Sequence, residues 1–337
     1  MRRAAASGIP GGRLWGRQAW HLGAEGLVAW LLAIAIAMLT MPASAAPPVV
    51  APAPGDQAVT LVDDAGRQLD LPRPARRIVS LSPHITELLF AVGAGDQVVG
   101  VDAWSNFPSA ARQRPRVGDL YALDLERIVA LKPDLLIVWH NGNSQRQLEV
   151  LRGLGLPIYH DGPRRLGDIP HSLEQMGRLT GHETQAQAAA STLRRRVVDL
   201  RERYARQPRV SVFYQVWTAP LLTVNATTLI GDVISLCGGD NIFGRLPMQA
   251  PRVSIESVIE ADPDVIVAAS LGQVGAEAGT AGDLADFSLW HAWPRLRAVR
   301  RQHLVALSDD LISRHTPRVL DGAERLCTAL DAARRAP

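Results

Sequence analysis

Four aromatic side chains of this sequence stand where a ligand could meet them. Trp104, Trp139 and Trp217 each close or follow a short apolar segment with the pattern of a buried β-strand, and Tyr121 lies in a short loop. In open α/β sheets, the carboxyl ends of the strands border the ligand cleft. Flat rings with a polar edge suit a large, partly apolar ligand. The pattern therefore predicts a binding wall, although core packing is the alternative for each residue taken singly.

Two histidines accompany these aromatic residues. His140 directly follows the second tryptophan, and His84 lies in the segment Ser82–Glu87, which follows a predicted strand and begins a helix. Ser82 is suited to cap this helix and Glu87 to complement its dipole. Because a helix N-terminus disfavours an imidazolium, a neutral His84 could ligate a metal. A packing or surface role is nevertheless the favoured interpretation of His84, and we predict no resident metal ion. If a metal is bound, His84 and His140 are the candidate metal ligands.

The sequence contains no catalytic signature. The patterns G-x-S-x-G, H-E-x-x-H and G-x-x-x-x-G-K-[ST] are absent, and Ser, His and Asp have no spacing that assigns them catalytic roles. We therefore predict a binding protein without a catalytic cofactor rather than an enzyme. An exported hydrolase is a remote alternative, which predicts turnover that depends on one Ser or Asp.

The elements that must position these residues occur twice along the chain. The first copy begins near Arg77 and closes with Leu125–Trp139, and the second begins near Val210 and closes with Ile255–Val267. Each closing segment has a short helical pattern, then Pro-Asp, then an apolar strand. Strands that alternate with helices predict a mostly parallel sheet covered on both faces. The predicted fold is therefore α/β, with two Rossmann-like lobes and a ligand cleft between them.

The segments between and before these copies complete the predicted organisation. Glu183–Tyr204 has no Pro or Gly and is rich in helix formers, so it predicts one long, stiff helix between the lobes. Alternating residues around Asp64-Ala65-Gly66 predict a small hairpin. The predicted domains are a signal peptide (1–45), a tether and small β addition (46–75), an N-terminal α/β lobe (76–181), a backbone helix (182–207) and a C-terminal α/β lobe (208–337).

The first 45 residues have the pattern of an export signal. An arginine-bearing start leads into the apolar Gly26–Met41, and Ala43-Ser44-Ala45 follows as a small-residue cleavage pattern. A retained membrane anchor is the alternative, but about sixteen apolar residues are marginal for crossing a bilayer. No cysteine stands near the cleavage pattern, which disfavours a lipid anchor. We therefore predict a soluble periplasmic protein.

The charge balance of the remaining chain is close to neutral. The net charge is +3, and residues 1–45 contain four arginines against one glutamate. Nucleic-acid binding needs a concentrated basic face, which the sequence does not require. We expect a monomer that binds no nucleic acid.

Cys237 and Cys327 are the two cysteines of the chain. In an oxidising compartment, a disulfide between them is the favoured interpretation, and it would close a loop of about 90 residues. Both lie on apolar stripes, so two buried free thiols are the alternative.

Glu126 and Glu256 occupy matching positions in the two halves. Asp124 and Ser254 stand two residues before them as candidate helix N-caps. Compensation of a helix dipole is a sufficient structural explanation of each glutamate. An exposed glutamate at the same place on each lobe also suits docking onto arginines of a membrane partner, so both interpretations stay open.

The segment Arg77–Asn143 resembles the periplasmic cobalamin-binding proteins of ABC importers, and the resemblance continues loosely to the C-terminus. It is strongest in Ser80–Leu88, in Leu125–Val138 and in Cys237–Phe243. The resemblance implies two Rossmann-like lobes, a backbone helix and small opening motions. It also implies an inner-membrane ABC permease as partner.

The resemblance further assigns roles to particular residues. It implies a disulfide between Cys237 and Cys327, and permease-docking carboxylates at Glu126 and Glu256. These assignments come from the matching positions rather than from the spacing of the residues.

A corrinoid is the transported ligand that the resemblance implies. Trp104 and Trp139 fall on matching aromatic positions, whereas the second-lobe loop keeps Asp310 and Arg314 but lacks the aromatics of the family. His140 is a candidate ligand for cobalt in a base-free corrinoid. Haem or a ferric siderophore is the alternative within the class. The predicted ligand-binding residues are Trp104, Tyr121, Trp139, His140, Trp217, Asp310 and Arg314.

Overall fold

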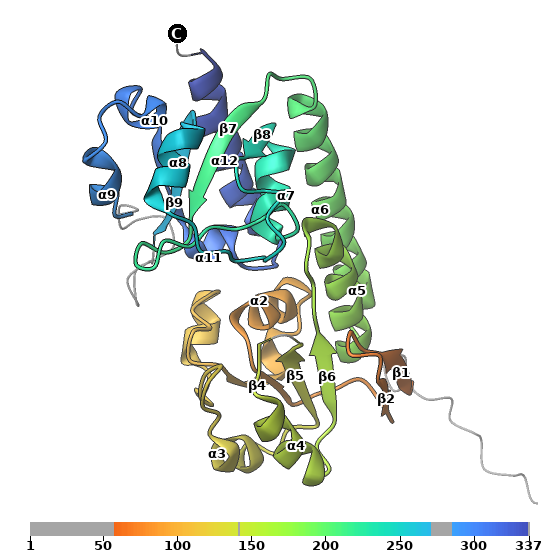
Figure 1. The fold of residues 1–337 in the computed structure, drawn as a ribbon. Helices are drawn as coiled ribbons and strands as arrows, with labels where there is room; N and C mark the ends of the chain where they lie inside the picture. Colours follow the sequence, from red (N-terminus) through yellow and green to blue (C-terminus); the bar gives the residue numbers. More distant parts are fainter. Residues whose placement is uncertain (1–56, 141, 271–284, 336–337) are drawn as a thin grey trace, which may run out of the picture. The chain divides into compact units, whose positions relative to one another are not determined.

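The computed structural model describes residues 57–140, 142–270 and 285–335. The predicted signal peptide and most of the predicted tether lie outside these residues. Within them, no helix combines the length and the apolar character needed to cross a membrane. The described chain forms two α/β lobes with a long helix between them in the sequence, as predicted (Figure 1).

A two-stranded hairpin precedes the first lobe. Its strands β1 (Val59–Val62) and β2 (Gln68–Leu71) pair in antiparallel fashion. Asp63 closes the turn, because its carboxylate accepts hydrogen bonds from the backbone N–H groups of Ala65 and Arg67. The hairpin predicted from the alternating pattern is confirmed.

The first lobe is built on a parallel sheet with strand order β4-β3-β5-β6. Its strands are short apolar runs, which is typical of a parallel sheet covered on both faces. The elements of the lobe are β3 (Ile78–Ser80), α2 (Pro83–Ala91), β4 (Val98–Val101), α3 (Leu125–Ala130), β5 (Leu135–Trp139), α4 (Gln145–Gly153), β6 (Ile158–Asp161) and α5 (Ile169–Thr180), with short 3-10 turns at Gly95–Gln97, Ser109–Gln113 and Leu166–Asp168.

The predicted backbone helix is α6 (Glu183–Tyr204), whose 22 residues span about 33 Å. Gly181 ends α5 with a φ of +76°, a left-handed conformation that favours glycine. The chain then turns, and α6 packs along α5 (Figure 1). The two helices are in close contact at Gly177, where an added Cβ would collide with the Cβ of Ala186. The connection between the lobes is therefore a packed helix pair, which is stiffer than a single helix.

The second lobe carries another parallel sheet, with strand order β10-β9-β7-β8. In both lobes the first strand lies between the second and the third, and the fourth strand is at an edge. The repeat read from the sequence is thus confirmed at the level of topology. The elements are β7 (Val210–Gln215), α7 (Leu229–Leu236), β8 (Gly239–Asn241), α8 (Ile255–Ala261), β9 (Val265–Ser270), α9 (Ser288–His291), α10 (Arg297–Arg300), β10 (Leu304–Ser308), α11 (Asp309–Ile312) and α12 (Val319–Arg335).

Strand β8 has no clear signal in the sequence. Its residues Gly239, Asp240 and Asn241 have low β-propensity. Pairing with β7 places them in the sheet, so tertiary context overrides the local preference.

A disulfide joins Cys237, just after α7, to Cys327 in α12. Both residues are fully buried. The favoured interpretation of the two cysteines is therefore confirmed, and the alternative of two free thiols is wrong.

Candidate functional site

The carboxyl ends of the parallel strands bring polar side chains to one edge of each sheet. In the first lobe, Ser82, Asp102 and Asp161 stand at or just beyond the ends of β3, β4 and β6. In the second lobe, β10 runs directly into α11, whose Asp310 and the following Arg314 face the first lobe. The candidate site is the junction at which these groups meet.

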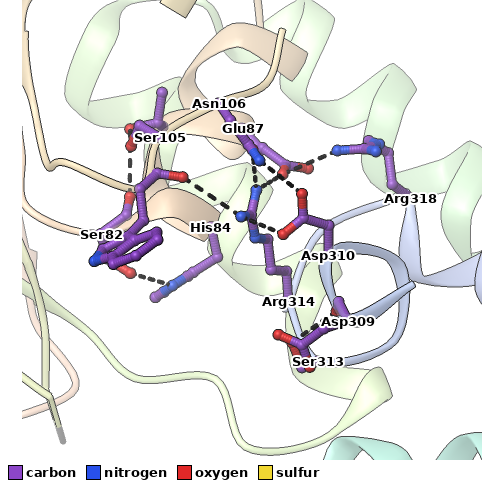
Figure 2. Close-up of polar contacts among 12 residues, drawn as sticks. Ser82, His84, Glu87, Ser105, Asn106, Asp309, Asp310, Ser313, Arg314 and Arg318 are labelled. Carbon is purple, nitrogen blue, oxygen red and sulfur yellow. Dashed lines mark hydrogen bonds and ion pairs between the residues drawn. The ribbon is translucent and has the colours of Figure 1, made fainter. Parts of the chain in front are cut away.

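A cluster of ion pairs crosses this junction, as Figure 2 shows. Glu87 Oε1 of α2 accepts hydrogen bonds from Arg314 Nη1 at 2.8 Å and from Arg318 Nη1 at 3.1 Å. Arg314 also pairs with Asp310 at 2.5 Å. Asn106 completes the cluster, because its amide donates to Asp310 Oδ2 and accepts from Arg314, each at 2.7 Å. We call these five residues the interlobe cluster.

The interlobe cluster is shielded from solvent. The side chain of Glu87 is 2% exposed and that of Arg314 is 12% exposed. Buried ion pairs gain little net stability over apolar packing, but the loss of one partner leaves a costly buried charge. Removal of one partner would therefore leave an unpaired buried charge at the contact between the two lobes.

Two sequence-based assignments in α2 are wrong in detail. Glu87 does not lie in the first turn of the helix to complement its dipole; it is buried and pairs with the arginines of the second lobe. Ser82 occupies the N-cap position, but its hydroxyl makes no capping bond and instead lies 2.7 Å from Nδ1 of His84. Glu87 is thus held by partners from the other lobe, whereas the Ser82 hydroxyl is held by a side chain two residues away.

His84 belongs to a second buried group beside the interlobe cluster. Its Nε2 lies 3.3 Å from Asp161 Oδ2, and its side chain is 6% exposed. The ring also packs edge-on against Trp139 and against His315 of the second lobe, with centroid separations of 5.8 and 6.2 Å. Within the described residues, no three His, Cys, Asp or Glu side chains are arranged to hold a metal ion. The geometry of His84 is that of a packed, hydrogen-bonded imidazole.

His315 is predicted to make the stability of the protein depend on pH. Burial lowers the pKa of His315 to about 4 from 6.5, the neighbouring His84 adds to this shift, and Asp161 and Asp168 oppose it. Between pH 6.5 and 4 the unfolded state therefore binds more protons, so stability falls as the pH falls. From pH 7 to pH 5 we expect a loss of about 2 kcal/mol from this group. Urea unfolding at several pH values measures it.

Replacing His315 with Gln should remove this part of the pH dependence. The matched control is His291→Gln, because His291 is exposed in α9. Equal pH slopes for the wild type and His315→Gln would show that His315 does not carry the effect.

The buried carboxylate of Asp102 holds the loop that carries Trp104. Asp102 Oδ2 accepts the backbone N–H of Trp104 at 3.0 Å, and the hydroxyl of Ser105 donates to the other oxygen. Burial raises the pKa of Asp102, and the Ser105 hydrogen bond opposes that shift. Arg116 donates to the backbone carbonyls of Asp102 and Ser105. The indole of Trp104 is thus presented on a rigid loop and is 57% exposed.

The remaining predicted ligand residues differ in their environments. Trp139 is half-buried against the core, and His140 packs edge-on against His160. Trp217 is 51% exposed, and its indole N–H donates to the carbonyl of Ala219. Tyr121 is 87% exposed in a turn that Asp119 closes. The structure thus connects Trp104, Trp139, Asp310 and Arg314 to the junction, whereas Trp217 and Tyr121 make their polar contacts within their own loops.

The two predicted docking glutamates occupy equivalent positions. Glu126 is the second residue of α3 and Glu256 the second residue of α8, and both are exposed. Asp124 and Ser254 cap these helices by accepting the N–H of the residue three positions later. Hydrogen bonds from its own backbone and from Ser254 lower the pKa of Glu256. Docking by these residues stays a prediction.

Sequence reasoning missed several members of the junction. Asn106, Arg318, Asp161 and His315 have no motif that singles them out. The spacing of Asp310, Arg314 and Arg318 at intervals of four residues was the one available signal.

Comparisons with known proteins place this architecture among characterised relatives. Residues 78–311 match the family model described as periplasmic binding protein. A vitamin B12-binding protein of Vibrio cholerae is 37% identical over 265 residues, which are 78% of this chain and 92% of that protein. A vitamin B12-binding protein of Yersinia pestis is 38% identical over 278 residues, which are 82% of this chain and 92% of that protein.

Solved structures of periplasmic binding proteins also match this fold. The periplasmic vitamin B12 binding protein BtuF of Vibrio cholerae superposes with a TM-score of 0.68 at 37% identity, covering 78% of this chain and 99% of that chain. The periplasmic heme-binding protein RhuT from Roseiflexus sp. RS-1 also has a TM-score of 0.68, at 23% identity, covering 77% of this chain and 100% of that chain. The second match shows a shared fold alone.

Proposed function

Because the chain belongs to the periplasmic binding protein family, we propose that it captures a corrinoid between its two lobes and delivers it to an ABC permease of the inner membrane. The curated relatives named above support the ligand class, since the match covers nearly their whole length. The corrinoid is cobalamin or a close relative of it.

One observation carries this proposal: predicted ligand residues from different lobes are in contact. Arg314 of the second lobe donates to the backbone carbonyl of Trp104 in the first, at 3.4 Å. The loop that carries the exposed indole of Trp104 is therefore held against Arg314, which also pairs with Asp310. We assign Trp104 to stacking on the corrin ring, and Asp310 and Arg314 to hydrogen bonds with polar groups at its edge.

The other proposed ligand contacts come from further strand ends and loops of the two lobes. Trp139 and His140 follow the neighbouring strand end and suit a second side of the ligand, whereas Trp217 and Tyr121 supply exposed aromatic faces at other loops. We propose that all four contact the ligand.

The proposal also covers where and how the protein works. Its relatives are binding proteins of the periplasm. We infer that this chain acts there as a soluble monomer after removal of residues 1–45, without a lipid anchor, and that it carries out no chemical step on its ligand. Glu126 and Glu256 are the proposed contacts with the permease.

Calorimetric titration of the exported protein with cyanocobalamin, cobinamide and haemin tests the ligand assignment. We expect tight one-to-one binding of at least one corrinoid, and the ratio of the two corrinoid affinities reports whether the lower base is recognised. A shifted haemin Soret band together with no corrinoid binding would replace the corrinoid with haem. Turnover of any of the three ligands would contradict the binding role.

A further inference from the structure

A small three-stranded β-ribbon follows the carboxyl end of β7. Trp217 lies on its first strand, Leu222 on the second and Arg252 on the third, and antiparallel bridges join Trp217 to Leu222 and Leu222 to Arg252. Leu222 N–H donates to the carbonyl of Trp217 at 3.0 Å, and Val253 N–H donates to that of Leu221 at 3.1 Å. Because the carboxyl ends of parallel strands border the ligand cleft, the ribbon belongs to the cleft edge of the second lobe.

Three side chains form a row on the outer face of this ribbon. Residues that are directly opposed on neighbouring strands project from the same face, with Cβ atoms about 5 Å apart. Leu221 and Thr223, on either side of Leu222, are buried, whereas Leu222 is half-buried and both Trp217 and Arg252 are exposed. Trp217, Leu222 and Arg252 therefore lie side by side toward solvent, and we call them the ribbon row.

The two ends of the ribbon row differ in chemistry. The indole N–H of Trp217 is already satisfied by the carbonyl of Ala219, so the ring offers apolar surface. Leu222 continues this apolar surface, and the guanidinium of Arg252 ends it with a positive charge. The row thus passes from an aromatic ring to a cation across two strand spacings, which is about 10 Å.

The guanidinium of Arg252 makes no hydrogen bond and no ion pair with any other residue that the structure describes. Arg314 and Arg318, by contrast, both donate to Glu87. The nearest acid along the sequence, Glu256, takes its hydrogen bonds from its own backbone and from Ser254. A guanidinium presents a planar fork of donors that matches the oxygens of an anion. The ribbon row therefore offers an unused anion-binding group beside an apolar surface.

We propose that Arg252 pairs with an anionic group of the ligand, while Trp217 and Leu222 pack against the apolar part that carries this group. The inference rests on the proposed corrinoid function, and the anion is then the phosphodiester that joins the lower base of a complete cobalamin to the corrin ring. An aromatic base next to a phosphodiester matches the order of chemistry along the ribbon row. Arg252 is thus a specificity residue that favours cobalamin over cobinamide, which lacks this phosphodiester.

Calorimetric titration of Arg252→Gln with cyanocobalamin and cobinamide tests the assignment. The two corrinoids share the corrin ring, but cobinamide has neither the phosphodiester nor the base. Haemin, whose anionic groups are carboxylates, is the third probe. The matched control is Arg295→Gln, because Arg295 is also an exposed arginine of the second lobe but lies between α9 and α10. A second variant, Arg252→Lys, keeps the positive charge without the planar fork.

We expect Arg252→Gln to weaken cyanocobalamin binding about tenfold and to change cobinamide binding less than twofold, because one charge-assisted pair is lost. Arg252→Lys should bind cyanocobalamin with an affinity between those of the wild type and Arg252→Gln. Arg295→Gln should match the wild type with every probe. Added salt should weaken cyanocobalamin binding more in the wild type than in Arg252→Gln, because salt screens an exposed ion pair.

The outcomes separate this contact from the function itself. Wild-type affinity of Arg252→Gln for cyanocobalamin would overturn the contact while leaving corrinoid binding intact. Equal weakening of both corrinoids would also overturn it, since Arg252 would then contact the corrin ring. Weakening of haemin binding alone would assign the anion to a carboxylate instead of the phosphodiester. If the wild type binds neither corrinoid, the proposed function fails, and this inference fails with it.

Discussion

Reversing the charges of Glu126 and Glu256 together, by substitution with Lys, is expected to abolish corrinoid uptake by cells while leaving the affinity for ligand unchanged. Both side chains are exposed at equivalent helix starts, one on each lobe. If arginines of the permease pair with them, the substitutions replace attraction by repulsion at two contacts, which costs several kcal/mol. Uptake should fall by about 100-fold or more.

The control must change the net charge equally without touching the proposed contacts. Asp96→Lys combined with Asp240→Lys does so, because these exposed acids lie one on each lobe and neither belongs to α3 or α8. This control should retain uptake. A docking variant that loses ligand affinity, yet still assembles with the permease in vesicles, would contradict the assignment.

Circular dichroism should accompany this comparison. A lysine near a helix start opposes the helix dipole and lowers stability by about 0.3–1 kcal/mol per site. Such a loss leaves the folded fraction nearly unchanged, so it does not account for an uptake defect.

Removing the disulfide should cause the largest loss of stability. The bond between Cys237 and Cys327 closes a loop with a sequence separation of 90 residues. Its constraint on the unfolded chain corresponds to about 4–5 kcal/mol. The Cys237→Ala/Cys327→Ala variant should therefore show this loss in urea unfolding, with additional cost from the two buried sulfur atoms.

Reduction of the wild-type protein provides the control. The wild type in excess reductant should approach the stability of the double variant, and reductant should leave the double variant unaffected. A difference below about 1 kcal/mol between the oxidised wild type and the double variant would show that the crosslink constrains the unfolded chain little.

Local sequence patterns were sufficient for most of the secondary structure. The two Pro-Asp segments predicted the strands that begin at Leu135 and Val265, because a short apolar run after a turn has few alternatives. The long helix Glu183–Tyr204 followed from residue propensity and the absence of Pro and Gly. By contrast, β8 has no such local signal and exists through its pairing with β7.

The candidate site was only partly predictable. Trp104 and Asp310 follow strand ends, where the topology of a parallel sheet directs ligand residues. Glu87 was misassigned, because its partner Arg314 lies 227 residues away in the chain. No short-range pattern reports a contact of that separation.

The sequence by itself determined the family, the two repeated lobes, the long helix and the strand ends at which ligand residues stand. These features follow from hydrophobic periodicity, turn residues and helix-start patterns, and each such pattern spans only a few residues. The tertiary structure alone decided that Glu87 pairs with Arg314 and Arg318 and that His84 meets Asp161 and His315. The physical reason is that a buried polar group takes its partner by proximity in the folded chain, and residues far apart in the sequence become neighbours only when the sheets and the two lobes have packed.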